Sequence, residues 1–211
     1  MQKIKKGMVI LMAGKNYKQK IIFGMDSIHV ATVDTDGTFG TPVKILGAKA
    51  CEASFESSEI FEYADNIVVD SDKRVTKGSG KLSVLGLTME EKALLSGVEV
   101  MSGGVAIGAT TNAPNLALMF AQNKRDGGKI LNVIYNVQFS IPGIQATSTE
   151  EERSAQIVEL DFTCLPDIND QLVMYQVDTT DSTADSTMVS KWFTEVQKPK
   201  PTAGVQFYIE A

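Results

Sequence analysis

Histidine, cysteine and net basic charge are all scarce in this sequence of 211 residues. His29 is the only histidine, and Cys51 and Cys164 are the only cysteines. Two cysteines so far apart do not supply the ligands of a zinc site, and we expect two free, buried thiols. A catalytic histidine would need an activated nucleophile, and the sequence has no Gly-x-Ser-x-Gly motif. We therefore expect no enzyme activity, no cofactor and no metal site.

Basic residues are also outnumbered, because the formal net charge is −6. Tight binding of nucleic acid needs a basic surface, so we do not expect the chain to hold phosphates tightly. The charge is unevenly spread: residues 1–20 contain six lysines and no acid, whereas the interval between Arg153 and Lys191 contains seven acids and no basic residue. Segments of opposite charge predict self-association between copies, with two solvated surfaces as the alternative.

Long apolar runs are missing as well. Residues 8–13 form an apolar run behind three lysines, but six residues are fewer than a signal peptide requires, and no small-x-small cleavage site follows. No other stretch approaches the ~18 apolar residues of a membrane-spanning helix. We expect a protein without a membrane partner, made and folded in a reducing cytoplasm.

The strongest pattern in the sequence is a period of two, which is typical of β-strands. Along residues 131–141 apolar side chains take the odd positions and mainly polar ones the even positions, and residues 158–164 alternate in the same way. Residues 116–122 are apolar on both faces, as in a central strand or a subunit interface. Asp126-Gly127-Gly128 supplies the positive φ of a hairpin turn, which predicts antiparallel pairing of the strands on either side.

One short helix is predicted between the strands. Thr88 and Glu91 have the spacing of a capping box, in which each side chain accepts a hydrogen bond from the other residue's backbone amide. Gly97 is the residue type that ends a helix in the left-handed conformation. We expect a helix within residues 88–97 that packs on the sheet.

Two segments do not follow the core pattern. Residues 52–80 form a long polar excursion with embedded aromatic residues, and such a loop is costly to order unless it contacts something. Residues 179–211 begin with a loop rich in Thr, Asp and Ser and end in a strand-like segment.

The order of several motifs resembles a known family. An Asp-Gly turn precedes Phe39-Gly40-Thr41-Pro42-Val43 and Ile45-Leu46-Gly47-Ala48, and an alternating Glu/Ser strand precedes Tyr63-Ala64-Asp65-Asn66. A Gly-rich strand, the short helix, an apolar strand, a Lys/Arg hairpin and the corner Phe139-Ser140-Ile141-Pro142 follow. In this order the sequence resembles the major tail tube protein of long-tailed, non-contractile phages, over roughly residues 22–177.

The resemblance implies a mainly β fold: an antiparallel β-sandwich or partial barrel with one short flanking α-helix, a long stacking loop and terminal arms. It implies three parts: a basic N-terminal arm (residues 1–20), a β-sandwich tail-tube domain (residues 21–177) and a C-terminal arm (residues 178–211). Both arms lack a counterpart in the family pattern, which leaves a tube terminator or a defective-prophage particle as variants of the role.

The resemblance also implies a function without catalysis or a cofactor. Copies of the chain would close into rings, hexameric in this family, and the rings would stack into a virion tail tube for genome passage. The implied partners are further copies of the chain, the tape measure, tail terminator and distal tail proteins, and DNA that passes without tight binding. The protein would be made in the host cytoplasm.

Three groups of residues are candidates for these roles. The candidate lumen-facing residues, which would alternatively face outer solvent, are Glu159, Asp161, Thr163, Asn132, Asn136 and Gln138. The candidate inter-ring loop residues are Phe55, Phe61, Tyr63, Asp65, Asn66, Asp72, Lys73 and Arg74. The candidate inter-subunit arm residues, expected to dock on acids of residues 159–185 in another copy, are Lys3, Lys5, Lys6, Lys15, Lys18 and Lys20.

A binding module is the competing hypothesis. A carbohydrate-binding-like sandwich on a virion or cell surface would need a cluster of exposed aromatic side chains. The candidates are Trp192, Phe193, Phe207 and Tyr208, all near the end of the sequence.

Overall fold

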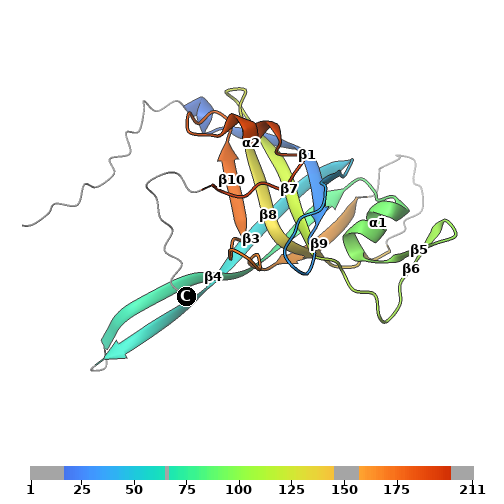
Figure 1. Cartoon of the computed structure of the whole chain (residues 1–211), viewed down its shortest axis with the longest axis horizontal. Coiled ribbons are helices and arrows are strands. Elements are labelled where there is room, and N and C mark those ends of the chain that lie inside the picture. The colour runs from blue at the N-terminus through green and yellow to red at the C-terminus, as the bar shows by residue number, and fades with distance from the viewer. Residues whose placement is uncertain (1–16, 65–66, 145–156, 201–211) are drawn as a thin grey trace, which may run out of the picture.

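The computed structural model describes residues 17–64, 67–144 and 157–200, and its main element is a curved antiparallel sheet (Figure 1). The sheet has eight strands in the order β2-β1-β7-β8-β9-β4-β3, with β10 pairing with β8 off this path. The elements are η1 (Tyr17–Gln19), β1 (Ile22–Thr32), β2 (Val43–Lys44), β3 (Ala48–Ala64), β4 (Ile67–Val84), α1 (Met89–Ser96), β5 (Glu99–Met101), β6 (Gly104–Ala106), β7 (Leu116–Lys124), β8 (Lys129–Phe139), β9 (Val158–Cys164), β10 (Met174–Asp178) and α2 (Ser186–Ser190).

β2 and β3 lie at opposite ends of the strand order but are consecutive in the chain. The short connection between them therefore brings the two ends of the sheet together. The amide of Ile45 donates to the carbonyl of Ile28 in β1, and the amide of Leu85 donates to the carbonyl of Gly47. The result is a partial barrel that stays open, flanked by α1. The predicted mainly β, antiparallel architecture with one short flanking helix is therefore confirmed.

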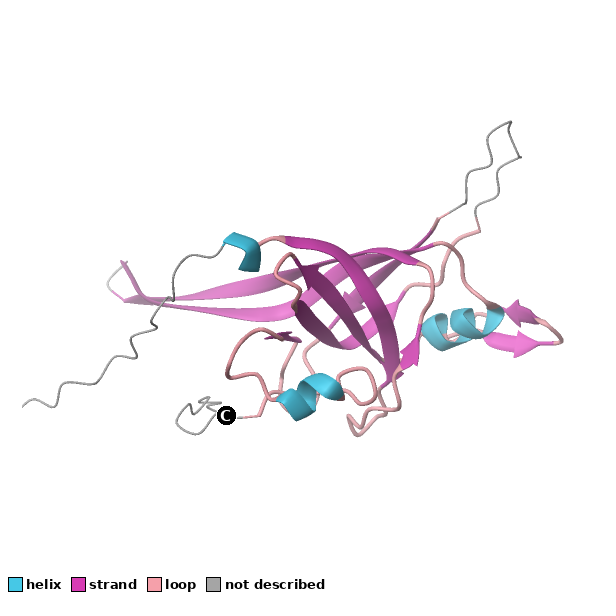
Figure 2. Cartoon of the chain, turned by 90° about the horizontal axis from the view of Figure 1, so that it is seen from above, coloured by secondary structure: helices cyan, strands magenta, loops and turns pink. Residues whose placement is uncertain are grey.

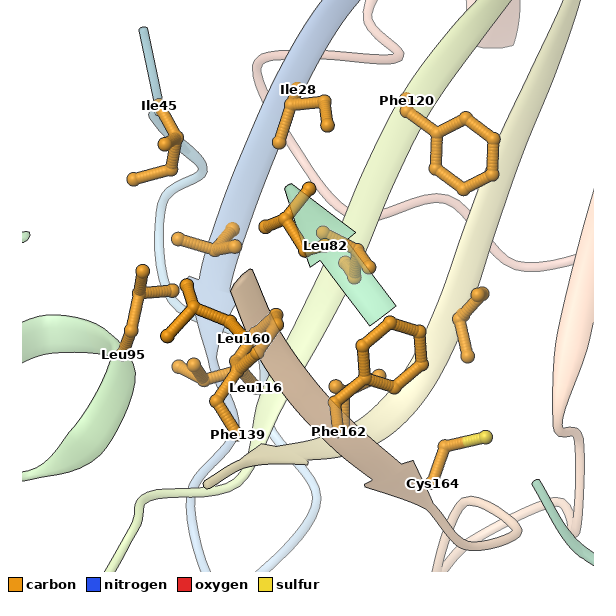
Figure 3. Packing of buried hydrophobic residues seen from close by; sticks show 14 of the residues in the cluster. Ile28, Ile45, Leu82, Leu95, Leu116, Phe120, Phe139, Leu160, Phe162 and Cys164 are labelled. Carbon is orange, nitrogen blue, oxygen red and sulfur yellow. The ribbon is translucent and has the colours of Figure 1, made fainter. Parts of the chain in front are cut away.

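The main core fills the inside of this partial barrel (Figure 3). β1, β4, β7, β8 and β9 all contribute, and Leu82, Leu116, Leu160 and Phe162 are at most 2% exposed. Helix α1 adds Leu95, which is fully buried. The capping box of Thr88 and Glu91 is formed as predicted, and Gly97 ends the helix with a φ of 66°.

A bulge in β8 changes the predicted alternation of that strand. Asn136 has a φ of 50°, and β7 pairs Leu116 with Val137 but Leu118 with Ile134, so β8 contains one additional residue. Apolar side chains enter the barrel from Ile134 before the bulge and from Val137 after it. The prediction that the odd positions of residues 131–141 share one core face is therefore wrong.

A second core covers the other face of the sheet. Tyr135 and Trp192 are fully buried there together with Met119 and Val133, and the Tyr135 hydroxyl donates a 2.6 Å hydrogen bond to the carbonyl of Gln197. Residues 179–200, including α2, form this cover, which Figure 2 shows beside the sheet. The packed domain thus extends to residue 200 instead of ending at the predicted boundary of 177, and residues 201–211 lie outside the described chain.

Two lysines anchor this cover: Lys124 of β7 donates a 2.8 Å hydrogen bond to the Thr180 hydroxyl, and Lys198 of the cover pairs with acids of the loop between β9 and β10. Lys124, whose side chain is 1% exposed, lies 2.7 Å from Asp178 and 3.3 Å from Asp126. Lys198 lies 2.7 Å from Asp167, whose side chain is 1% exposed, and 2.9 Å from Asp170. Burial alone would raise the pKa of Asp167, but the hydrogen bond and charge of Lys198 outweigh burial and hold that pKa below its usual value.

The Lys198–Asp167 contact predicts a pH-dependent stability. Because the pKa of Asp167 is lowered in the folded chain, its contribution is complete above pH ~4 and is lost as the pH falls through the folded pKa. We expect Lys198→Met to cost about 2 kcal/mol of unfolding free energy at pH 7, since Lys198 is partly exposed, and less at pH 3. Urea denaturation at both pH values measures this difference.

Lys200→Met, which breaks an exposed pair with Asp185, is the control and should change the free energy of unfolding by less than ~0.5 kcal/mol. An equal loss for Lys198→Met at pH 7 and pH 3 would contradict the role of Asp167.

The junction of β4 with β9 predicts a steric effect. A methyl group at Gly80 would overlap the Phe162 ring and the backbone carbonyl of Glu52, whereas Gly86 has no atom within 4 Å of that position. We expect Gly80→Ala to destabilise the fold by about 2 kcal/mol and Gly86→Ala to be nearly neutral in urea denaturation. Equal effects of the two substitutions would show that the close approach at Gly80 is not needed.

Candidate functional site

The segment predicted as a long loop is a β-hairpin, so that prediction is wrong in its secondary structure. β3 and β4 pair from Ala48 and Val84 at the base to Ala64 and Ile67 at the far end. β9 pairs with β4 only from Gly78 to Val84, so beyond Gly78 the hairpin is two strands wide, with both edges unpaired among the described residues. Figure 1 shows this part projecting from the barrel. Pairing between the strands satisfies the backbone groups that a loop of this length would leave to water.

Two register shifts in β4 explain why the sequence pattern did not predict the hairpin. The pairing steps from Glu56–Lys77 to Ser57–Val75 and from Glu62–Asp70 to Tyr63–Val68, so β4 carries one extra residue at each shift. Each extra residue breaks the period of two along β4. Residues directly opposite each other in an antiparallel pair point to the same face, and this rule assigns the faces of the hairpin.

One face of the hairpin, called the apolar face below, carries its exposed aromatic and valine side chains, interspersed with Ser57, Glu59, Ser71 and Lys73. Phe55, Phe61 and Tyr63 of β3 share it with Val68 and Val75 of β4, and their exposed fractions range from 37% to 67%. The Phe61 and Tyr63 rings lie 6.5 Å apart. At the base, Phe55 pairs with Gly78, where an added methyl group would meet both the Phe55 ring and the Cys164 sulfur. The apolar face is therefore a continuation of the barrel core onto a surface that solvent reaches.

The opposite face of the hairpin is polar and continues across the sheet. On the hairpin Lys77 lies 3.2 Å from Glu56, and Arg74 pairs with Asp72. The same face runs over β3, β4, β9 and β8 as a polar hollow of about 710 Å³. In the hollow, the polar side chains are those of Glu52, Ser54, Ser79, Lys81, Gln138, Ser140, Asp161 and Thr163.

The hollow is acidic on balance, and Lys81 lies among its acids. Its ammonium group lies 2.8 Å from Glu159 and 3.9 Å from Asp161. The hydrogen bond to Glu159, followed by the charges of Glu159 and Asp161, raises the pKa of Lys81 above its usual value. Glu52 is the residue opposite Lys81 on β3, so three carboxylates surround one cation on this surface.

The structure separates the candidate lumen-facing residues into two groups. Glu159, Asp161, Thr163 and Gln138 are exposed on the polar face, and Gln138 pairs with Thr163. Asn132 is fully buried: its carboxamide accepts a 2.6 Å hydrogen bond from Gln176 and donates to the carbonyl of Ile130. Its assignment to an exposed face is wrong, because the bulge places it on the core side of β8.

Asn136 is not part of the exposed polar face either. It is the residue with positive φ in the bulge, it is half-buried, and its side chain donates to the carbonyl of Pro166. A left-handed asparagine inside a strand is a bulge signal. The sequence alone did not distinguish this asparagine from its neighbours in the alternating run.

The candidate inter-ring residues divide between the two faces of the hairpin. Lys73 pairs with Glu59 on the apolar face, whereas Asp72 and Arg74 belong to the polar face. Asp65 and Asn66 lie outside the described residues. Sequence reasoning missed Val68, Val75 and Glu59, whose positions follow only from the register.

The candidate arm residues are mostly outside the described chain. This applies to Lys3, Lys5, Lys6 and Lys15, while Lys18 and Lys20 are exposed in and next to η1. Of the seven acids proposed to receive the arm, all except Asp181 lie within 4 Å of a lysine of their own chain. Docking of the arm on residues 159–185 therefore stays a prediction, and it would have to compete with these contacts.

The remaining expectations concern isolated residues. Both cysteines are free, with Cys164 buried and Cys51 half-buried, and burial raises the pKa of the Cys51 thiol to about 12. His29 lies in β1, stacked 4.6 Å from Phe193. Trp192 is fully buried and so cannot belong to an exposed aromatic platform. Residues 207 and 208, the other aromatic candidates, are outside the described ranges.

Within residues 17–64, 67–144 and 157–200, no three His, Cys, Asp or Glu side chains are grouped as in a metal site. In that part of the chain, no helix has both the length and the apolar character needed to cross a membrane.

Comparisons with known proteins find a structural likeness but no sequence match. No protein-family model matches the sequence, and no curated protein matches it. Among solved structures, the chain is similar to the cryo-EM structure of the anti-feeding prophage cap, the AFP tube terminating cap. The TM-score is 0.36 at 12% sequence identity, and the match covers 81% of this chain and 99% of that chain. The function proposed below therefore rests on this chain's own residues.

Proposed function

We propose that this chain is a non-enzymatic structural subunit of a phage tail tube, which assembles into stacked rings around a channel for DNA. The observation that carries the proposal is the hairpin of β3 and β4, whose outer part has one apolar and one polar face. The motif order from Phe39 to Pro142, which resembles the tail tube family, supports the same role.

The projecting hairpin is incomplete as part of a monomer. An isolated two-stranded ribbon is marginally stable in water, and its open edges invite pairing with other chains. Here the exposed apolar face includes Phe61, at 45% exposed, and Tyr63, at 67%. Contact with another copy would bury this face and hold the ribbon in order, whereas a binding module has no need of such an element.

The polar face suits the wall of a DNA channel. The acids Glu52, Glu56, Asp72, Glu159 and Asp161 outnumber the bases Arg74, Lys77 and Lys81 on this face. Phosphates bind lysines and arginines by releasing counterions, so a wall with excess carboxylates lets DNA slide instead of retaining it. With the apolar face turned to a neighbouring copy, the polar face of the same hairpin would continue the wall along the tube.

The partners follow from this role. We propose that the chain contacts further copies of itself, the tape measure protein, the tail terminator and the distal tail protein, and that it resides in the virion tail after synthesis in the host cytoplasm. A single ring that never stacks would instead indicate a terminator.

The hairpin predicts the outcome of a deletion. Replacing residues 57–76 with a short Gly/Ser turn should leave a folded protein, because β9 and the barrel core contact only the hairpin base. The variant should no longer form tubes in negative-stain electron microscopy, while circular dichroism still shows the sheet. Tubes at wild-type frequency would contradict the proposal, as would a wild-type protein that stays monomeric at all concentrations.

The polar face predicts the effect of charge reversal. Changing both Glu159 and Asp161 to Lys should preserve the fold, since both side chains are more than half exposed, and should make purified tubes retain DNA. The matched control is the pair Asp34→Lys and Glu195→Lys, two exposed acids outside the hollow. DNA retained per tube, measured by a fluorescent dye after a salt wash, should rise in the first variant only. Equal DNA in both variants would place the channel at another surface.

A further inference from the structure

An apolar groove lies at the other end of the molecule from the hairpin tip. Helix α1, the loop after β6, the corner at residues 141–143 and the start of β9 enclose about 320 Å³. Its apolar lining includes Ile107, Ile141 and Ile157, which are 57%, 38% and 42% exposed. Lys92 and Glu159 also line the groove. Ile144, which is 96% exposed, also lines the groove, and four exposed isoleucines around one depression form an apolar surface that a partner can bury.

The positions of the groove and the hairpin fit contact between copies. Figures 1 and 2 place the tip of the β3–β4 hairpin at one end of the long axis and α1 with β5 and β6 at the other. A hairpin at one end and a groove at the other form a head-to-tail contact, which repeats from copy to copy and extends an assembly along one direction.

The charges beside the two apolar surfaces are complementary. Each surface carries one acid and one base: Glu59 lies opposite Lys73 on the apolar face of the hairpin, and Lys92 and Glu159 line the groove. Within the described residues neither Glu59 nor Lys92 forms an ion pair in its own chain. A carboxylate on one surface and an ammonium group on the other can pair when the apolar side chains meet.

We propose that the groove formed by α1, β6 and the start of β9 receives the apolar face of the hairpin of a second copy of this chain, with Glu59 of one copy facing Lys92 of the other. This inference deepens the proposed tube function and rests on it for the role of the assembly. Phe61 is the central apolar residue on the inserted face, and Ile107, which directly follows β6, is a groove residue with 57% of its surface exposed.

Paired substitutions on adjacent residues test the contact. Phe61→Asp should raise the protein concentration needed for assembly at least ~30-fold, as expected for a central interface residue. Ile60→Asp is its control, because Ile60 pairs with Asp72 on the opposite face of the hairpin and is 58% exposed. Ile107→Asp should have the same effect as Phe61→Asp, and Val100→Asp, at an exposed residue of β5 outside the groove lining, should not. Sedimentation velocity measures the assembly.

Mixing the two defective variants distinguishes this contact from other arrangements. Phe61→Asp retains an intact groove, and Ile107→Asp retains an intact hairpin, so a mixture can form one contact and then stop. We expect particles of twice the mass of either variant's own particle, and no longer chains. Failure of the mixture to form this particle would overturn the proposal, as would normal assembly of Ile107→Asp alone.

Charge reversal tests the register of the contact. Glu59→Lys and Lys92→Glu should each weaken assembly by at most about fivefold, as for exposed ion pairs, and combining them in one chain should restore it. No restoration would overturn the pairing of Glu59 with Lys92.

A photo-crosslinking residue placed at Phe61 separates this inference from the proposed function. Crosslinks to the groove without tubes would support the groove contact and contradict the tube. Tubes with crosslinks elsewhere, including residues 145–156 or a second hairpin, would support the tube and overturn the groove contact. Monomers without crosslinks would overturn both.

Discussion

The pairing of β4 with β9 from Gly78 to Val84 is the constraint on which the rest of the structure depends. It brings Leu82, Leu160 and Phe162 together in the core of the open barrel, and it fixes the direction in which the hairpin leaves the barrel. Gly78 and Gly80 allow this pairing, because the side chains of Phe162 and Cys164 occupy the space that larger residues would fill. From that junction outward, one face of the hairpin continues the core and the other continues the polar hollow.

Much of the fold could be predicted from local patterns. The Asp-Gly-Gly turn and its flanking strands, the doubly buried β7, and the capped helix α1 all form as expected, because each is specified by residues close together in the sequence. The position of residues 179–200 could not be predicted in this way. Trp192 packs on Tyr175 of β10 and lies in one core with Tyr135 of β8, and such contacts between distant segments leave no periodic signal.

The candidate site was predicted in part, and bulges account for most of the errors. The exposed residues Glu159, Asp161 and Thr163 lie in a strand without a register shift, so the alternating sequence pattern predicted correctly that their side chains are exposed. Asn132 was assigned to the wrong surface because a single inserted residue at Asn136 exchanges the two faces of β8. In the hairpin, two further shifts concealed an amphipathic ribbon whose apolar and polar faces are evident only from cross-strand pairing.

The central claim is that another copy of the chain covers the outer hairpin. Hydrogen–deuterium exchange of residues 52–77, compared between assembled and dispersed protein at one pH, tests it most directly, because a free two-stranded ribbon opens easily and exchanges fast. Our account predicts strong slowing of exchange in this segment on assembly, with little change in β7, whose amides lie in the centre of the sheet in both states. Exchange of residues 52–77 that is equally fast in assembled and dispersed protein would contradict it.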